Sequence, residues 1–173
     1  MTRHNIIITG FMGTGKTTVG KLLATKLGYD FVDTDELIVA RSGQTVEEIF
    51  QEKGEEAFRE MEAAVATELG GKEGLVIATG GSMMLDPANA AALSKGGRVF
   101  CLVAGPEEIL ERLAHDPEIR RPLLDGPDPM ARVVEIMRER EEGYACFPQL
   151  VTSGKSPEEL TNLLLELIQS ESA

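Results

Sequence analysis

The stretch GFMGTGKT, residues 10–17, combines residue types and a spacing that are suited to chemistry. It fits the pattern G-x-x-x-x-G-K-[ST], which is typical of a phosphate-binding loop. Glycines let backbone N–H groups curl around phosphate oxygens, and a helix that follows points its positive end at the anion. Lys16 would then reach the β- and γ-phosphates, and the Thr17 hydroxyl could bind Mg²⁺. The loop therefore predicts a nucleoside-triphosphate site.

Two aspartates, Asp33 and Asp35, follow the short apolar segment Phe31-Val32. In an extended segment, residues two apart face the same way, so both carboxylates could project into one place. In an open parallel sheet that place is the crevice beyond the carboxyl ends of the strands, where the phosphate-binding loop also lies. The alternative is an acidic N-cap before a helix that begins near Glu36, and one aspartate can serve both purposes.

The next apolar segment, residues 75–79, ends in Gly80-Gly81-Ser82. Nucleoside-triphosphate sites usually take a second Mg²⁺ carboxylate from an aspartate at the end of such a strand. Because this strand ends without one, Asp33 is the expected supplier of that acid. The paired glycines either allow another molecule to approach the backbone closely or form a tight turn.

Six arginines gather between residues 112 and 140 of a chain whose formal charge is −12. They are Arg112, Arg120, Arg121, Arg132, Arg138 and Arg140. Arginine is suited to bidentate recognition of phosphate and carboxylate groups. Arg132 and Arg138 could instead be helix-surface partners of nearby glutamates. Arg59, in EEAFREME, by itself reads as a solvated helix residue.

Prolines and a glycine crowd the segment HDPEIRRPLLDGPDP, residues 115–129. The segment is too broken for a regular element and too charged for the core. We therefore expect a mobile lid at about residues 114–128, which brings Arg120 and Arg121 to the site when it closes.

The elements that must position these groups alternate along the chain. We expect strands near residues 6–8, 31–32, 75–79, 99–103 and 150–152, and helices near 19–27, 86–93, 106–113, 128–142 and from 157 onward. Residues 36–70 read as helical, with interruptions at Ser42-Gly43 and Lys53-Gly54. That stretch is too long for a simple crossover, so it predicts a small helical insertion, at about residues 33–62, over one side of the site.

The composition limits the class of protein. The 173 residues fit a single domain over residues 1–173, and 42% hydrophobic with 27% charged residues is typical of a globular protein. A charge of −12 and the absence of tryptophan argue against a nucleic-acid partner. We expect a cytoplasmic protein with no membrane span, because neither a signal peptide nor an apolar run of roughly 20 residues is found.

Cys101 and Cys146 match no metal or redox spacing and are expected to be idle thiols.

Taken together, these motifs resemble the shikimate kinases, a family of small P-loop kinases. The match runs through nearly the whole chain in the order of the family: GFMGTGKTTVGKLLA at 10–24, DTD at 33–35, FRxxE at 58–62, TGG at 79–81, RPLL at 121–124, and Arg140 ahead of Tyr144. Many families share the phosphate-binding loop, whereas DTD, FR, TGG and RPLL at these separations are much more specific.

The resemblance implies transfer of a phosphoryl group from ATP, with Mg²⁺, to a hydroxyl of shikimate, giving shikimate 3-phosphate and ADP in aromatic amino-acid biosynthesis. The catalytic residues would be Lys16, Asp35 and Arg121. Asp35 would hold the acceptor hydroxyl, and Arg121 would lie on the lid. The nucleotide would contact Gly13, Thr14, Gly15, Lys16, Thr17, Thr18, Arg112, Arg121 and Pro157, with Arg112 and Pro157 beside the adenine. The substrate would contact Asp35, the amides of Gly80 and Gly81, and a carboxylate clamp of Arg59 and Arg140. The metal would be held by Thr17 and by Asp33 through its water shell.

The fold implied by the resemblance is a three-layer α/β P-loop kinase fold. Its five-stranded parallel sheet has the order 2-3-1-4-5 and helices on both faces; our strand count agrees, and the order comes only from the family. We expect a monomer. The alternatives are a P-loop kinase of another small hydroxy acid, such as gluconate, and a non-catalytic ATP-binding protein.

Two departures from the family pattern concern the substrate. The family usually has a third glycine where this chain has Ser82, and serine would be strained if that backbone needs a positive φ. The family usually reads R-x-P-L-Y where this chain reads Arg140-Glu141-Glu142-Gly143-Tyr144. Two added carboxylates beside a substrate-binding arginine would work against an anionic acceptor.

Overall fold

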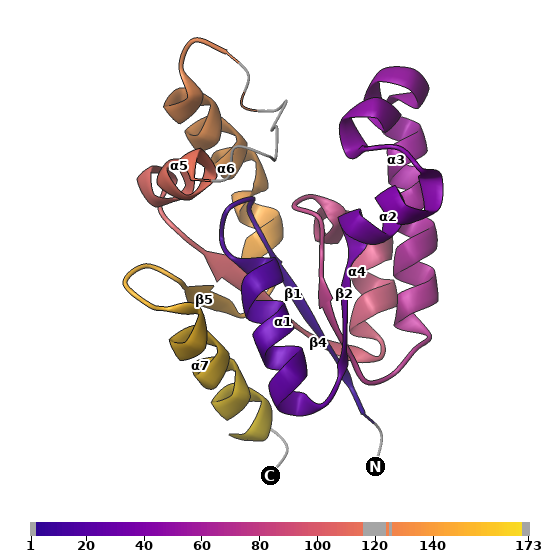
Figure 1. Ribbon diagram of the computed structural model, residues 1–173, viewed down its shortest axis with the longest axis vertical. Helices are drawn as coiled ribbons and strands as arrows, with labels where there is room; N and C mark the ends of the chain where they lie inside the picture. Colours follow the sequence, from indigo (N-terminus) through magenta and orange to yellow (C-terminus); the bar gives the residue numbers. More distant parts are fainter. Residues whose placement is uncertain (1–2, 116–123, 125, 171–173) are drawn as a thin grey trace.

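A single five-stranded parallel sheet forms the centre of the computed structural model, which describes residues 3–115, 124 and 126–170. The strand order is β2-β3-β1-β4-β5, and every neighbouring pair is parallel, which confirms the predicted order (Figure 1). The strands are β1 (Asn5–Gly10), β2 (Asp30–Asp33), β3 (Leu75–Ala78), β4 (Gly97–Val103) and β5 (Gln149–Val151).

Helices cover both faces of the sheet because the strand residues alternate between two cores. Ile7 and Ile77 lie in register and pack with α3 (Val46–Gly70) and α4 (Pro87–Ser94). The neighbouring Ile6 and Ile8 pack with α1 (Lys16–Leu27) and α7 (Pro157–Ser170) on the other face. Since β1 and β3 are buried along their whole length, residues 6–8 and 75–78 read as continuous apolar runs. The result is the predicted three-layer architecture.

The helical stretch after β2 is broken where the sequence predicted. Helix α2 (Thr34–Ser42) ends at Gly43, whose φ is +69°, and α3 is interrupted at Gly54, whose φ is +86° and ψ 169°. A capping box starts α3: the Glu48 N–H donates to Thr45 Oγ1 at 3.2 Å, and the Thr45 N–H donates to Glu48 Oε2 at 2.7 Å. Figure 1 shows the first half of α3 rising above the carboxyl ends of the strands.

A second group of helices stands on the β4 side of the sheet. It comprises the short helix η1 (Met83–Leu85), α5 (Pro106–Ala114) and α6 (Pro129–Ala145). Helix α6 runs three residues beyond the predicted end at Glu142, because Gly143 continues the helix and packs against Leu85. A separate core joins α5 and α6 to β4 through Ile109, Ile136 and Cys101.

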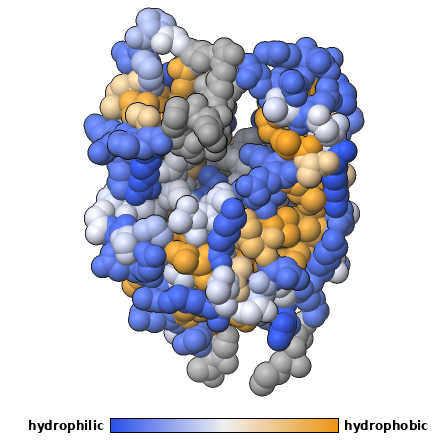
Figure 2. All heavy atoms as spheres, viewed as in Figure 1, coloured by the Kyte–Doolittle hydropathy of each residue, from blue (hydrophilic) through white to orange (hydrophobic). Residues whose placement is uncertain are grey.

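The space-filling view shows a hollow at the top of the molecule, between the part that carries α5 and α6 and the part that carries α2 and α3 (Figure 2). It lies above the carboxyl ends of the strands, where the phosphate-binding loop begins. Most of the lid predicted at 114–128, with Arg120 and Arg121, falls outside the described residues. Within the described part of the chain, none of the helices has the length and apolar character needed to cross a membrane.

Candidate functional site

The phosphate-binding loop connects β1 to α1 over residues 11–15. Gly13 and Gly15 have φ values of +74° and +93°, which other residues rarely adopt, so the glycine pattern has a direct conformational cause. The buried Thr14 hydroxyl donates to the carbonyl of Phe11 at 2.8 Å. Lys16 Nζ donates to the carbonyls of Gly10 and Phe11, both at 2.8 Å. The ammonium group is therefore held over the loop, beside the N-terminus of α1, where an anion would bind.

The first residues of α1 are joined to the end of β2 by one hydrogen bond. Thr17 Oγ1 donates to Asp33 Oδ2 at 2.8 Å, while Asp33 Oδ1 accepts from the N–H groups of Asp35 and Glu36 at 3.0 and 3.2 Å. One carboxylate thus caps α2 and also reaches the phosphate-binding loop, as the N-cap alternative allowed. The hydroxyl and carboxylate form an oxygen-only donor pair of the kind Mg²⁺ prefers. Among the described residues no cluster of three His, Cys, Asp or Glu could hold a metal by itself, so phosphate oxygens would complete such a site.

Asp35 is not part of an extended segment. It lies in the first turn of α2, so the strand geometry predicted for the Asp33 and Asp35 pair is wrong. The carboxylate nevertheless reaches the end of the neighbouring strand, since a Cβ added to Gly80 would lie 2.6 Å from Asp35 Oδ1. The Gly80 N–H donates to the buried Thr34 Oγ1 at 2.9 Å, so that amide already has a partner within the protein.

Arg59 is not a simple solvated residue, because three side chains accept from its guanidinium group. Nη1 donates to Glu62 at 2.7 Å and to Ser82 Oγ at 2.5 Å, and Nη2 donates to Glu55 at 3.1 Å. Burial raises the pKa of the Glu62 carboxyl, and the bond to Arg59 opposes that rise. Burial lowers the pKa of Arg59, but its bonds to the two glutamates outweigh this and leave the pKa raised.

Arg140 and Tyr144 lie one turn apart on α6 and face the Gly80-Gly81 turn. A Cβ on Gly81 would lie 3.0 Å from Arg140 Nη1, and the Tyr144 hydroxyl donates to the Gly81 carbonyl. Burial raises the pKa of Tyr144 to about 12, with Arg140 acting in the opposite direction. The guanidinium carbon of Arg140 is 5.6 Å from the ring centre of Phe11, which connects this group to the phosphate-binding loop.

Neither departure from the family pattern disturbs the site as the sequence suggested. The φ of Ser82 is −106°, which serine adopts without strain. Glu141 and Glu142 are exposed; the turn of the helix directs Glu142 away from the face that Arg140 shares with Tyr144, whereas Glu141 lies beside that face and lines a cavity with Tyr144. Water screens such exposed carboxylates, so they weaken anion binding little.

The remaining nucleotide-site predictions fall around the same loop. Arg112 Nη1 donates to the Gly13 carbonyl at 3.1 Å and to Thr152 Oγ1 at 3.2 Å, and Arg112 also pairs with Glu108. Thr18 is exposed in the first turn of α1, and Pro157 is the first residue of α7. The structure thus places Arg112 against the loop, whereas the predicted contacts of Thr18 and Pro157 with a nucleotide stay predictions.

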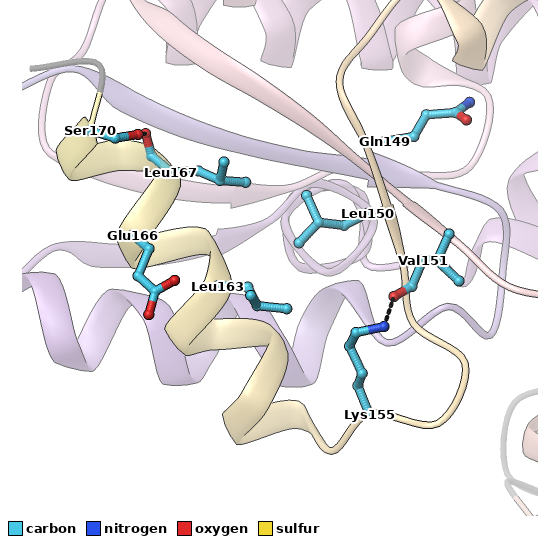
Figure 3. Close-up of a pocket in the computed structure, with 8 residues that line it drawn as sticks. All are labelled: Gln149, Leu150, Val151, Lys155, Leu163, Glu166, Leu167 and Ser170. Carbon is cyan, nitrogen blue, oxygen red and sulfur yellow. Dashed lines mark hydrogen bonds between the residues drawn. The ribbon is translucent and has the colours of Figure 1, made fainter.

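Of two cavities among the described residues, the first lies apart from this convergence and the second borders it. One of about 500 Å³ lies between β5 and α7, where Lys155 Nζ donates to the Val151 carbonyl at 3.2 Å and Leu163 and Leu167 form the apolar wall (Figure 3). It contains no residue of the phosphate-binding loop and none of the polar groups described above. A second, of about 320 Å³, lies between α6 and β4 and is lined by Phe11 and Thr14 of the phosphate-binding loop and by Tyr144. The candidate site therefore rests on the convergence of polar groups and not on cavity volume.

Two contributors, Glu62 and Ser82, were not assigned a role from the sequence. Glu62 follows Arg59 by three residues, so helical spacing could have paired them. Ser82 lies in a turn far from Arg59 in the chain, and no local pattern connects the two.

A family model described as shikimate kinase matches residues 12–169. A shikimate kinase of Geobacter sulfurreducens is 44% identical over 167 residues, which cover 96% of this chain and 91% of the relative. One of Caldanaerobacter subterraneus subsp. tengcongensis is 46% identical over 140 residues, 81% of each chain. Among solved structures, the shikimate kinase of Acinetobacter baumannii in complex with shikimate has a TM-score of 0.91 at 35% identity, covering 98% of this chain and 95% of that chain. A gluconokinase of Sinorhizobium meliloti, at 17% identity and a TM-score of 0.59 with 99% of each chain covered, shares the fold alone.

Proposed function

The chain belongs to the shikimate kinase family, and we propose that it transfers the γ-phosphoryl group of ATP to a hydroxyl of shikimate, giving shikimate 3-phosphate and ADP. The observation that carries the proposal is the turn of residues 80–82. Gly80 packs on Asp35, Gly81 on Arg140, and Ser82 accepts from Arg59. One short turn thus gathers a carboxylate and two guanidinium groups, which complement an acceptor that has both a hydroxyl and a carboxylate.

The phosphate-binding loop would hold the nucleotide. Lys16 would exchange its two carbonyl partners for phosphate oxygens, and backbone N–H groups at the start of α1 would face the same anion. Thr17 and Asp33 fit Mg²⁺, since both present oxygen atoms beside the loop. When bound, the ion would neutralise charge on the transferring phosphoryl group.

Asp35 would orient the acceptor hydroxyl, and its place is set by α2 and by close packing on Gly80. Phosphoryl transfer passes through a loose transition state, so the protein contributes mainly positioning and charge stabilisation. Arg59 and Arg140 would hold the carboxylate of shikimate. We also propose that Arg121, within the segment 114–128, meets the transferring phosphate when that segment closes, which excludes water from ATP.

The nearest rival is a kinase of another hydroxy acid. ADP release should be measured with ATP and Mg²⁺ alone, and then with shikimate, quinate and gluconate. We expect release with shikimate at a rate at least tenfold above that with the other acids. Faster turnover with gluconate would favour the rival, and ATP binding without ADP release from any acceptor would favour a non-catalytic role. The expected monomer and the cytoplasmic location stay predictions.

The role of Arg140 has its own test. Arg140→Ala should raise KM for shikimate much more than KM for ATP, because only the carboxylate clamp is lost. Arg132→Ala provides the control, since Arg132 lies on the same helix and pairs with the exposed Glu135 at 2.6 Å. Equal increases in both KM values, or a similar effect of the two substitutions, would argue against a clamp.

A further inference from the structure

We propose that Ser82 is a positioning residue for the acceptor, which acts by fixing the guanidinium group of Arg59. The inference rests on the proposed function, because it assigns Arg59 to the carboxylate of the acceptor. It concerns a side chain of this chain that the proposed mechanism does not otherwise use.

The partners of Arg59 differ in where they come from. Glu55 and Glu62 lie on α3 with Arg59, four residues before it and three residues after it. They move with the helix and cannot determine where the guanidinium group stands relative to the rest of the site. Ser82 lies beyond β3, in the turn that also packs against Asp35 and Arg140. Among the described residues, its hydroxyl is the hydrogen-bond partner that joins Arg59 to that turn.

Helix α3 has a kink shortly before Arg59. The helix is interrupted at Gly54, which has a φ of +86° and nothing within 4 Å of an added Cβ. Arg59 lies five residues beyond this kink, in the half of α3 in which Phe58, Glu62 and Val65 are buried. The bond of 2.5 Å from Arg59 Nη1 to Ser82 Oγ joins this half of the helix to the turn that follows β3.

The bonds also orient the guanidinium group. A guanidinium has five N–H donors, and Nη1 points both of its donors at Glu62 and Ser82. The third partner, Glu55, takes one donor of Nη2 and has a side chain that is 67% exposed. Within the described part of the chain, Nε and the second Nη2 donor have no acceptor, so these are the donors that could bind a carboxylate. Because a serine hydroxyl is neutral, it holds the guanidinium group without reducing its charge.

Ser82→Ala and Ser82→Thr separate the hydroxyl from the backbone, since the φ of −106° suits all three residues. We expect Ser82→Ala to raise KM for shikimate roughly fivefold to tenfold, the usual effect of losing one such bond, with kcat and KM for ATP within about twofold. Ser82→Thr retains the hydroxyl and should restore most of the lost affinity. Ser94→Ala, at the exposed end of α4, is the control and should change nothing.

A double-mutant cycle tests whether Ser82 acts through Arg59. In an Arg59→Lys background, Ser82→Ala should change KM for shikimate by less than about twofold, because the guanidinium group is no longer there to be held. An equal effect of Ser82→Ala in both backgrounds, or an unchanged KM in the parental background, would overturn the proposal. If the parental protein released no ADP with shikimate, the proposed function would fail and the role of Ser82 with it. Normal parental turnover with a silent Ser82→Ala would refute the role of Ser82 alone.

Discussion

Gly80→Ala should inactivate the enzyme without unfolding it. The φ of Gly80 is not positive, so alanine suits the backbone, and the bond from the Gly80 N–H to Thr34 can remain. The added methyl group would lie 2.6 Å from Asp35 Oδ1, whereas ordinary contact begins at 3.4 Å. The Asp35 carboxylate must therefore move by about 0.8 Å. A displacement of about 1 Å in a group that aligns the reaction can cost roughly 100-fold in rate.

The assay is steady-state ADP release with shikimate, together with thermal unfolding. We expect kcat to fall roughly 100-fold while KM for ATP and the Tm stay close to the parental values, because the displaced atoms are the flexible end of one side chain. Gly71→Ala is a matched control: its φ is −89°, and the nearest atom to an added Cβ is a backbone oxygen at 3.5 Å. A kcat within threefold of the parental value would refute the role given to Asp35. A fall in Tm that accounts for the lost activity would refute the steric reasoning.

Three further substitutions or treatments test other parts of the molecule. Lys16→Ala should lower kcat by about 100-fold to 1,000-fold, since it removes a charge at the transferring phosphoryl group, and near-parental ADP release would contradict this. Asp33→Asn keeps an oxygen to cap α2 but loses the negative charge, so the Mg²⁺ concentration for half-maximal activity should rise roughly tenfold at an unchanged Tm. Burial raises the pKa of Cys101 to about 11, so at pH 8 its thiol is protonated and unreactive, whereas Cys146 is exposed. A thiol reagent should therefore label one cysteine in the native protein and two after denaturation, and Cys146→Ser should abolish the native reaction.

Local patterns predicted those elements whose cause is itself local. The glycines of the phosphate-binding loop need positive φ values, and Gly43 and Gly54 interrupt the long helical stretch at the expected places for the same reason. The strand segments were recognisable because β1 and β3 are buried on both faces, so residues 6–8 and 75–78 are all apolar. The order of the strands followed from family resemblance alone, since apolar runs do not specify their neighbours.

The prediction for Asp35 failed at an element boundary. It assumed that the strand, in which every second side chain faces the same way, continues past Asp33. In fact Asp33 caps a helix, and Asp35 already lies in the first turn of that helix. Both carboxylates still reach the site, by different routes: Asp33 through Thr17, and Asp35 through its contact with Gly80.

The amino-acid sequence by itself determined the phosphate-binding loop, because its backbone conformation depends on residue types within a few positions. Tertiary structure alone decided how the acceptor side is assembled. Asp35, Arg59 and Arg140 come from three different helices, and each meets one residue of the turn 80–82. The parallel order β2-β3-β1 places α2, α3 and that turn together at the carboxyl ends of the strands, and α6 packs against η1, which follows the turn. The bond between Arg59 and Ser82 exists for the same reason: it joins two segments that are neighbours in the folded chain and not along it.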